Sequence, residues 1–98
     1  MGGIEEYILK GKVGHPLVIS LPANPTTGFS WEIERCSPKL KCRELPYRQY
    51  GGGLGAGGVQ RFKVESLHTG AFVVRLRLKR PWETRVREMR TYRIVVKK

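Results

Sequence analysis

Short runs of alternating apolar and polar residues, separated by glycine and proline, constrain the fold of this chain more than any other feature. The clearest run is AFVVRLRLK, residues 71–79. Its even-numbered positions are Phe72, Val74, Leu76 and Leu78, and its odd-numbered positions are mostly basic. Because side chains alternate between the two faces of a β-strand, the run predicts one buried face and one solvated, basic face.

Seven runs of this kind predict an all-β chain without a helix. The expected strands are residues 4–10, 16–21, 29–35, 40–45, 59–66, 71–79 and 88–96. Seven short strands at this spacing favour an immunoglobulin-like β-sandwich of about seven strands, although periodicity alone leaves a closed barrel open. A length of 98 residues predicts a single domain over residues 1–98.

The formal net charge is +11, from 19 lysines and arginines against 8 acids. Such a balance indicates attraction to polyanions or to an acidic protein face. The alternation assigns much of the charge to the solvent faces of strands, which is the interpretation we prefer for most of it. All the acids are glutamates, and without aspartate the sequence argues against EF-hand loops and Asp-dependent catalytic triads. His15 and His68 lack metal-ligand spacing, so we expect no enzyme, no cofactor and no metal.

The two cysteines, Cys36 and Cys42, are too few for a disulfide framework or a four-thiolate zinc site. A bridge across the intervening SPKLK is sterically possible if those residues turn back, but we interpret both cysteines as free thiols. The N-terminal segment carries acids where a signal peptide would carry basic residues, and no apolar run approaches the roughly 20 residues that span a bilayer. We therefore expect a soluble protein, either cytoplasmic or a mature form that has lost its leader.

Three unusual segments fall in connections between the predicted strands. The first, NPTTGF, comprises residues 24–29. The second, YGGGLGAGG, comprises Tyr50 and the glycine-rich residues 51–58. The third, RPWETR, comprises residues 80–85. In a sandwich of this kind the three corresponding connections emerge at the same end. The sequence therefore predicts that the three segments lie together.

The first segment combines turn residues with two threonines. Pro25 fixes φ, Asn24 can hydrogen-bond its own backbone downstream, and Gly28 permits a positive φ. Taken alone, these residues describe an ordinary turn. Thr26 and Thr27 are stiff β-branched residues at the tip that we expect to offer their hydroxyls outward, which suits presentation to a partner.

Aromatic residues flank the first and third segments. Phe29 and Trp31 follow the first segment at alternate positions, and we expect both to be core anchors. Arg80-Pro81-Trp82 is compatible with a core tryptophan beside a turn proline, or with an exposed recognition anchor. Trp and Arg are enriched in binding hot spots, and the surrounding turn and charged residues favour exposure of Trp82.

The glycine-rich segment has three interpretations. Composition alone favours a flexible linker, since only Leu54 and Ala56 in residues 51–58 carry side chains. Three of the glycines match G-x-G-x-x-G, but a strand follows them, so the helix N-terminus that binds phosphate is missing. The third interpretation is a backbone that lies along the cleft of another protein, with Leu54 in a pocket.

Together, the three segments resemble the signature loops of the chagasin-type inhibitors of papain-like cysteine peptidases. The matching residues are Asn24-Pro25-Thr26-Thr27-Gly28-Phe29, Leu54-Gly55-Ala56-Gly57-Gly58 and Arg80-Pro81-Trp82. Their order and spacing also fit, and the resemblance covers essentially the whole chain. It implies an immunoglobulin-like fold that blocks the active-site cleft of a peptidase reversibly and without chemistry.

The resemblance also implies a role for each segment. Thr26 and Thr27 would lie over the enzyme's Cys–His pair, and Arg80 and Trp82 would contact one wall of the cleft. The segment Leu54–Gly58 would run along the non-primed side, with Leu54 filling the main specificity pocket. The expected partner is a papain-like cysteine peptidase, with no nucleic acid and no membrane, and the expected state is a monomer.

A basic β-domain that binds single-stranded nucleic acid is the alternative function. Its contacts would come from the arginines and lysines of the last two predicted strands, with Trp82 or Tyr50 stacking on bases. This alternative accounts for the charge but gives no reason for the two threonines or for the glycine-rich segment.

Overall fold

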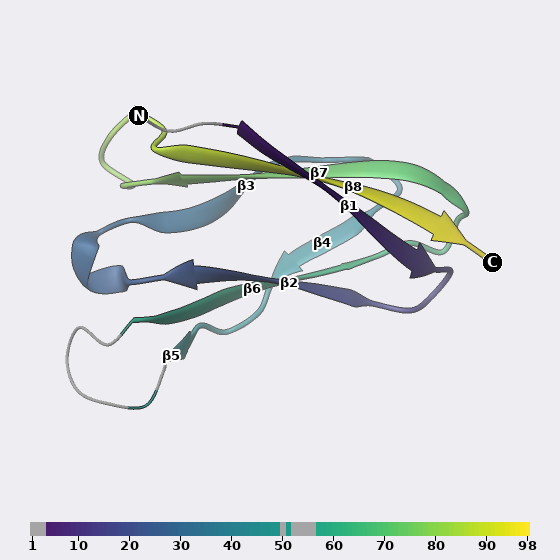
Figure 1. Ribbon diagram of the computed structural model, residues 1–98, viewed down its shortest axis with the longest axis horizontal. Helices are drawn as coiled ribbons and strands as arrows, with labels where there is room; N and C mark the ends of the chain where they lie inside the picture. The colour runs from purple at the N-terminus through teal and green to yellow at the C-terminus, as the bar shows by residue number, and fades with distance from the viewer. Residues whose placement is uncertain (1–3, 50, 52–56) are drawn as a thin grey trace.

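The computed structural model describes residues 4–49, 51 and 57–98, which form two packed β-sheets (Figure 1). The strands are β1 (Ile4–Lys12), β2 (Leu17–Ala23), β3 (Ser30–Cys36), β4 (Lys41–Glu44), β5 (Arg48–Gln49), β6 (Gly58–Glu65), β7 (Gly70–Lys79) and β8 (Glu88–Lys97). A single turn of 3₁₀-helix, η1 (Pro25–Thr27), lies between β2 and β3.

The first sheet has the order β1-β8-β7-β3 and the second the order β2-β6-β4, with β5 also pairing with β6. β1 runs parallel to β8, and the other pairings between these strands are antiparallel. The predicted immunoglobulin-like sandwich is confirmed, with eight strands in the described residues. The additional strand, β5, has two residues, which is too short to show a periodic pattern.

The alternating runs of the sequence build the core between the two sheets. In β6 and β7 every second residue is buried, as in Phe62 and Val64 or Val74 and Leu76. The predicted buried face of β7 is confirmed, although Leu78 is only half-buried. The opposite face of β7 is half-buried where full solvation was expected, because its arginines lie against glutamates of β3.

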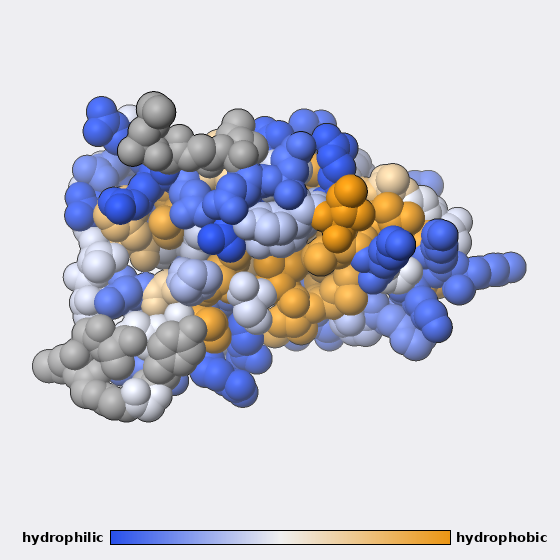
Figure 2. Space-filling model, viewed as in Figure 1, coloured by the Kyte–Doolittle hydropathy of each residue, from blue (hydrophilic) through white to orange (hydrophobic). Residues whose placement is uncertain are grey.

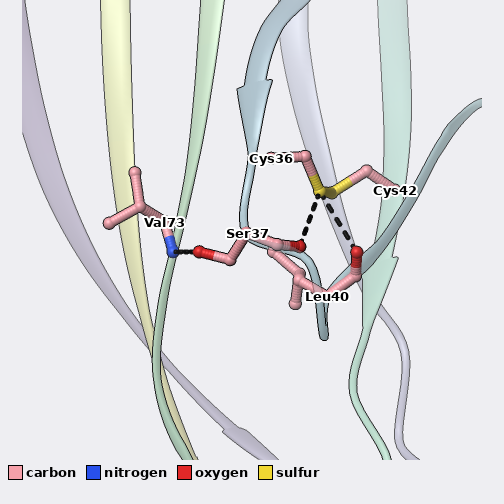
Figure 3. The surroundings of a disulfide bond; sticks show 5 residues. All are labelled: Cys36, Ser37, Leu40, Cys42 and Val73. Atoms are coloured by element: carbon pink, nitrogen blue, oxygen red, sulfur yellow. Dashed lines mark hydrogen bonds between the residues drawn. A yellow bond between two sulfur atoms is a disulfide. The ribbon is translucent and has the colours of Figure 1, made fainter.

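A disulfide joins Cys36, at the end of β3, to Cys42 in β4 (Figure 3). A tight turn lies between them, in which the N–H of Leu40 donates to the carbonyl of Ser37 at 3.0 Å. Ser37 in turn exchanges two hydrogen bonds with the backbone of Val73 on β7. The expectation of free thiols is therefore wrong, because the SPKLK segment turns back and brings the two Cα atoms to 6.9 Å.

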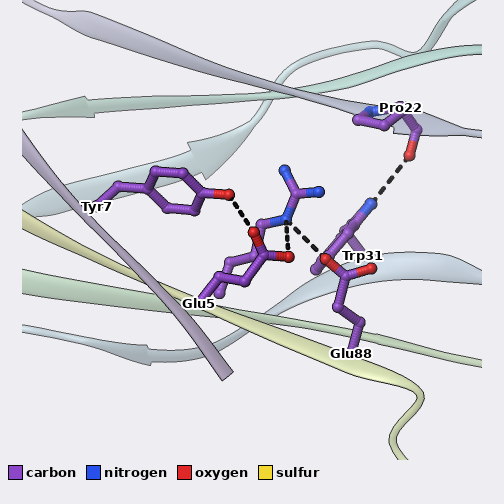
Figure 4. A network of polar contacts seen from close by, with 6 residues as sticks. Glu5, Tyr7, Pro22, Trp31 and Glu88 are labelled. Carbon is purple, nitrogen blue, oxygen red and sulfur yellow. Dashed lines mark hydrogen bonds and ion pairs between the residues drawn. The ribbon is translucent and has the colours of Figure 1, made fainter. Parts of the chain in front are cut away.

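A polar network ties β1 to β8 (Figure 4). The Tyr7 hydroxyl donates to the Glu5 carboxylate at 2.5 Å, and the Arg90 Nε lies 2.9 Å from the Glu88 carboxylate and 4.0 Å from that of Glu5. The hydrogen bond from Tyr7 holds the pKa of Glu5 below its ordinary value, and the same bond raises the pKa of Tyr7.

Apolar residues gather along the middle of the face that β1 and β2 border, between the two sheets, with hydrophilic residues around them (Figure 2). Both of these strands are sheet edges, so the side of the sandwich is open between them. Within the part of the chain that the structure describes, no helix has the length and apolar character to cross a bilayer.

Candidate functional site

Two of the connections that carry the unusual sequence segments, β2–β3 and β7–β8, meet at one end of the sandwich (Figure 1). The β2–β3 connection contains residues 24–29, and the β7–β8 connection contains residues 80–87. The start of β6, at Gly58, reaches the same end. Leu54, Gly55 and Ala56 lie outside the described residues.

Asn24 organises the β2–β3 loop. Its backbone is extended, with φ −137° and ψ 97°, and its Oδ1 accepts from the Thr26 N–H at 3.1 Å and from the Thr26 hydroxyl at 2.6 Å. The carbonyl of Asn24 accepts from the Thr27 N–H at 3.0 Å and from the Thr27 hydroxyl at 2.7 Å. Both threonines are exposed, but their hydroxyls point back at Asn24, contrary to the expectation that they face outward.

This difference has a simple cause in local hydrogen bonding. An asparagine at the cap of a helical turn satisfies the free N–H groups of that turn, and hydroxyls two and three residues later reach the same acceptors. The consequence is a loop whose tip is fixed from within. Its outer surface is formed by Pro25 and by the exposed parts of Thr26 and Thr27.

Gly28 connects this loop to Trp82. Its φ of 82° confirms the predicted positive φ, and its N–H donates to the Pro25 carbonyl at 3.0 Å. A Cβ at Gly28 would lie 2.7 Å from Cη2 of Trp82, so the indole packs where only a glycine leaves room. Trp82 is nevertheless 72% exposed, which confirms the predicted exposure, and Pro81 is exposed beside it.

Arg80 joins the same two loops through the Phe29 side chain. Its Nε donates to the Thr27 carbonyl at 3.2 Å, and its Cζ lies 4.4 Å from the centre of the Phe29 ring. Arg87 lies over the same ring at 5.0 Å, and Glu83 lies 3.8 Å from the Arg80 guanidinium. Phe29 is half-buried in this cation–π arrangement, so its expected role as a core anchor is wrong.

Arg87 is a site residue that the sequence analysis missed, because it follows the predicted third segment. Because Arg85 and Arg90 lie close to Arg87 in the sequence, Arg87 could not be distinguished there from an arginine on the solvated surface. The position of Arg87 depends on the register between β7 and β8. Its N–H donates to the carbonyl of Leu78 at 2.8 Å, which closes the β7–β8 connection beside Phe29.

The end of the glycine-rich segment packs against the β2–β3 loop. Gly57 has φ 76°, and a Cβ there would lie 3.4 Å from the Ala23 carbonyl oxygen and 3.8 Å from Cβ of Asn24. Gly58 is buried, and a Cβ there would lie 2.5 Å from the hydroxyl of Tyr47, which itself lies 3.3 Å from the Ala23 carbonyl. These two glycines are thus required for close packing, which a flexible linker does not explain.

Trp31 and Gln60 support the loops from below. Trp31 is 2% exposed, as predicted for a core anchor, and its Nε1 donates to the Pro22 carbonyl at 3.1 Å (Figure 4). The buried amide of Gln60 accepts from the Trp31 N–H at 2.6 Å and donates to the Trp31 carbonyl at 3.0 Å. Gln60 therefore joins the two sheets directly below the loops, a role that no pattern in the sequence revealed.

A shallow groove runs between the β2–β3 and β7–β8 loops. Its lining comprises Pro22, Ala23, Asn24, Thr27, Phe29, Leu78, Arg80 and Arg87. The groove offers hydrogen-bonding groups, an aromatic ring and two guanidinium groups. Across the described residues, no group of three or more His, Cys, Asp or Glu side chains is placed to hold a metal ion.

Comparison with known proteins gives concordant matches. The chagasin family of peptidase inhibitors, I42, matches residues 10–96. Chagasin from Trypanosoma cruzi is 37% identical over 76 residues, which cover 71% of this chain and 69% of chagasin. Amoebiasin-1 from Entamoeba histolytica is 35% identical over 65 residues, which cover 65% of this chain and 64% of amoebiasin-1.

A solved structure supports the fold. PbICP-C, determined in complex with falcipain-2, matches with a TM-score of 0.76 and 17% identity, over 97% of this chain and 90% of that chain. The family match covers the first and third segments, both described here, and spans the glycine-rich segment between them. The resemblance seen in the sequence is confirmed, and the chain belongs to the chagasin family of peptidase inhibitors, which are inhibitors and not enzymes.

Proposed function

We propose that this protein inhibits papain-like cysteine peptidases reversibly, by placing three loops from one end of its sandwich across the active-site cleft. The β2–β3 loop enters the centre of the cleft, with Thr26 and Thr27 facing the catalytic Cys–His pair. Arg80 and Trp82 contact one wall. The proposed contact residues are Asn24, Pro25, Thr26, Thr27, Gly28, Phe29, Leu54, Gly55, Ala56, Gly57, Gly58, Arg80, Pro81 and Trp82.

The observation that carries this proposal is the direct packing of the loops on one another. Trp82 lies against Gly28, Arg80 donates to Thr27, and Gly57 lies against Asn24. Segments that are far apart in the chain therefore form a single surface. The role of Leu54 in the main specificity pocket rests on the family resemblance.

The loop tip is suited to inhibition because its conformation is already fixed. Four hydrogen bonds to Asn24 hold Thr26 and Thr27, so little conformational entropy is lost when the loop docks. A loop held as a 3₁₀ turn does not present an extended peptide bond to the catalytic cysteine. We therefore expect the peptidase not to cleave the inhibitor, which should dissociate from the enzyme intact.

Trp82 is the expected energetic anchor of the interface. At 72% exposure it has a large apolar surface to bury, and tryptophan is the side chain most enriched in binding hot spots. An interface of ordinary size, about 1,600 Å² in total, suffices for tight binding when such an anchor is buried. The net charge of +11 also speeds encounter with an acidic peptidase, an effect that salt screens.

Inhibition of papain by the native protein and by Ala variants tests the proposal. We expect reversible inhibition, recovery of uncleaved inhibitor, and a loss of about 1–3 kcal/mol in binding for Trp82→Ala and for Leu54→Ala. The double variant Thr26→Ala/Thr27→Ala removes the hydroxyls that fix the tip and is expected to bind more weakly.

Leu67→Ala is the matched control for loss of an exposed apolar side chain. Leu67 is 62% exposed and lies in the connection between β6 and β7, at the opposite end of the sandwich. We expect its inhibition constant to equal that of the native protein. Inhibition that survives all the loop substitutions would refute the three-loop arrangement.

A further inference from the structure

We propose that the outer face of the β2-β6-β4 sheet binds a linear sulfated polysaccharide along a row of basic residues, here called the basic stripe. The stripe comprises Lys41, Arg43, Arg48, Arg61 and Lys63. The alternating burial of β6 turns Arg61 and Lys63 away from the core. Register places Arg43 opposite Lys63, and places Arg48 opposite Val59 on the same outer face.

Most of the glutamates form ion pairs on the other sheet or in the β7–β8 connection. Six of the eight glutamates form ion pairs, all on the β1-β8-β7-β3 sheet or in the β7–β8 connection: Glu5, Glu6, Glu32, Glu34, Glu83 and Glu88. Glu44 is directed to the inner side, where it accepts from the Gln60 amide at 3.1 Å. Residues 1–3, 50 and 52–56 contain no acid.

The basic stripe is therefore left without neutralising partners. None of its five residues takes part in an ion pair within the described ranges. Glu65, opposite Lys41, is the one acid on this outer face. Arg43 and Lys63 are like charges directly opposite each other, which destabilises a sheet, and a bound anion would relieve that repulsion.

The shape of the stripe favours a linear polyanion over a membrane surface. It follows β6 from Val59 to Glu65 and the adjoining β4 and β5, a length of about 20 Å at roughly 3.3 Å per residue. On the other flank of β6, the outward-facing residues of β2 are Val18, Ser20 and Pro22, which are uncharged. The charge is thus a narrow line and does not cover the whole sheet face.

The outer face also lacks the groups that single-stranded nucleic acids use. None of its outward-facing positions in β2, β4, β5 and β6 holds an aromatic residue, so it offers no stacking platform for bases. Sulfate groups require only positive charge and hydrogen-bond donors, which lysine and arginine supply. On β7 and β8, where the nucleic-acid alternative placed its contacts, Arg75, Arg77, Arg90 and Arg93 are in ion pairs.

Binding centred on Arg43 and Lys63 leaves the inhibitory end accessible, because only Arg48, opposite Val59, brings the stripe close to Gly58 at that end. Arg43 and Lys63 lie on the face of the sheet, whereas the loops project from its end (Figure 1). A polysaccharide-bound inhibitor would therefore still reach a peptidase. The inference does not depend on which peptidase the loops recognise.

Titration calorimetry with a heparin-derived decasaccharide, at several salt concentrations, tests the inference. The variant Arg43→Gln/Lys63→Gln removes two stripe charges, and Lys10→Gln/Lys12→Gln removes two exposed charges from β1 on the other sheet. We expect the stripe variant to lose about tenfold or more in affinity, with a log–log salt slope lower by about 2, whereas the control changes little. Unchanged papain inhibition in both variants, with thermal unfolding at or above the native temperature, would show that the fold is intact.

Three outcomes would overturn the inference. An equal loss in both variants would show that net charge alone attracts heparin. Tighter binding of a single-stranded oligonucleotide, or of phosphatidylserine vesicles, at the same salt concentration would assign the stripe to that partner. Equal binding of a desulfated decasaccharide would remove the role of the sulfates.

Discussion

Replacing Gly28 by alanine is expected to weaken inhibition by displacing a residue of another loop. The Cβ introduced would lie 2.7 Å from Cη2 of Trp82, whereas unstrained carbon atoms approach to about 3.5–4.0 Å. The indole must therefore move by about 1 Å. Because Trp82 is 72% exposed, the movement costs little folding free energy, but it takes the anchor out of its binding position.

Two separate magnitudes follow from this geometry. The φ of 82° is unfavourable for alanine by about 1–2 kcal/mol, which should appear as a loss of unfolding free energy in urea. Displacement of a hot-spot tryptophan is expected to cost about 2 kcal/mol in binding, or about 30-fold in the inhibition constant for papain.

Gly14→Ala separates these two effects. Gly14 lies in the connection between β1 and β2 and has a similar φ of 74°. A Cβ introduced there would have Cδ2 of Leu67 as its nearest neighbour at 3.9 Å, an ordinary van der Waals distance. We expect the same loss of stability as for Gly28→Ala, with an unchanged inhibition constant.

A double variant completes the test. In a Trp82→Ala background the indole is absent, so Gly28→Ala should add little to the loss of inhibition. If the losses of Gly28→Ala and Trp82→Ala were instead additive, or if Gly28→Ala inhibited papain as well as the native protein, the packing of the two loops would have no part in binding.

Two further predictions concern the framework below the loops. Since the pKa of Glu5 is lowered in the folded state, the ionised carboxylate stabilises the fold above about pH 4.5, and this contribution is lost as pH falls through the folded pKa. The unfolding temperature of Glu5→Gln should therefore depend less on pH in that acidic range than the unfolding temperature of the native protein. Equal pH profiles would contradict the role of the Tyr7 hydrogen bond. Gln60→Leu leaves the N–H and carbonyl of Trp31 buried without partners and should lower the unfolding free energy in urea by about 2–6 kcal/mol, at about 1–3 kcal/mol for each of the two groups. A loss below about 0.5 kcal/mol would show that the amide is dispensable.

The sequence predicted the sandwich well because its strands obey a rule of period two that burial enforces. Phe72, Val74 and Leu76 are buried as the alternation required. The short strand β5 escaped prediction because two residues carry no period. The disulfide between Cys36 and Cys42 escaped because it depends on whether the five intervening residues turn back, which their composition does not decide.

The candidate site was predictable where a motif spans consecutive residues, and less so where side chains meet across loops. The positive φ of Gly28 and the exposure of Trp82 follow from local chemistry. The cation–π contacts around Phe29 and the buried amide of Gln60 arise from register between strands that are distant in sequence. No local pattern encodes such register, so these residues required the structure.

The parallel pairing of β1 with β8 constrains the order in which the chain can fold. Ile4 pairs with Met89 and Lys12 with Lys97, and β8 is the strand through which β1 joins its sheet. These contacts bring together residues that are separated by almost the whole length of the sequence. Loops of this length are entropically unfavourable and slow to form. During synthesis, β1 leaves the ribosome before β8 and must therefore wait for it before it can dock, and until then β1 is an unpaired β-strand exposed to other chains.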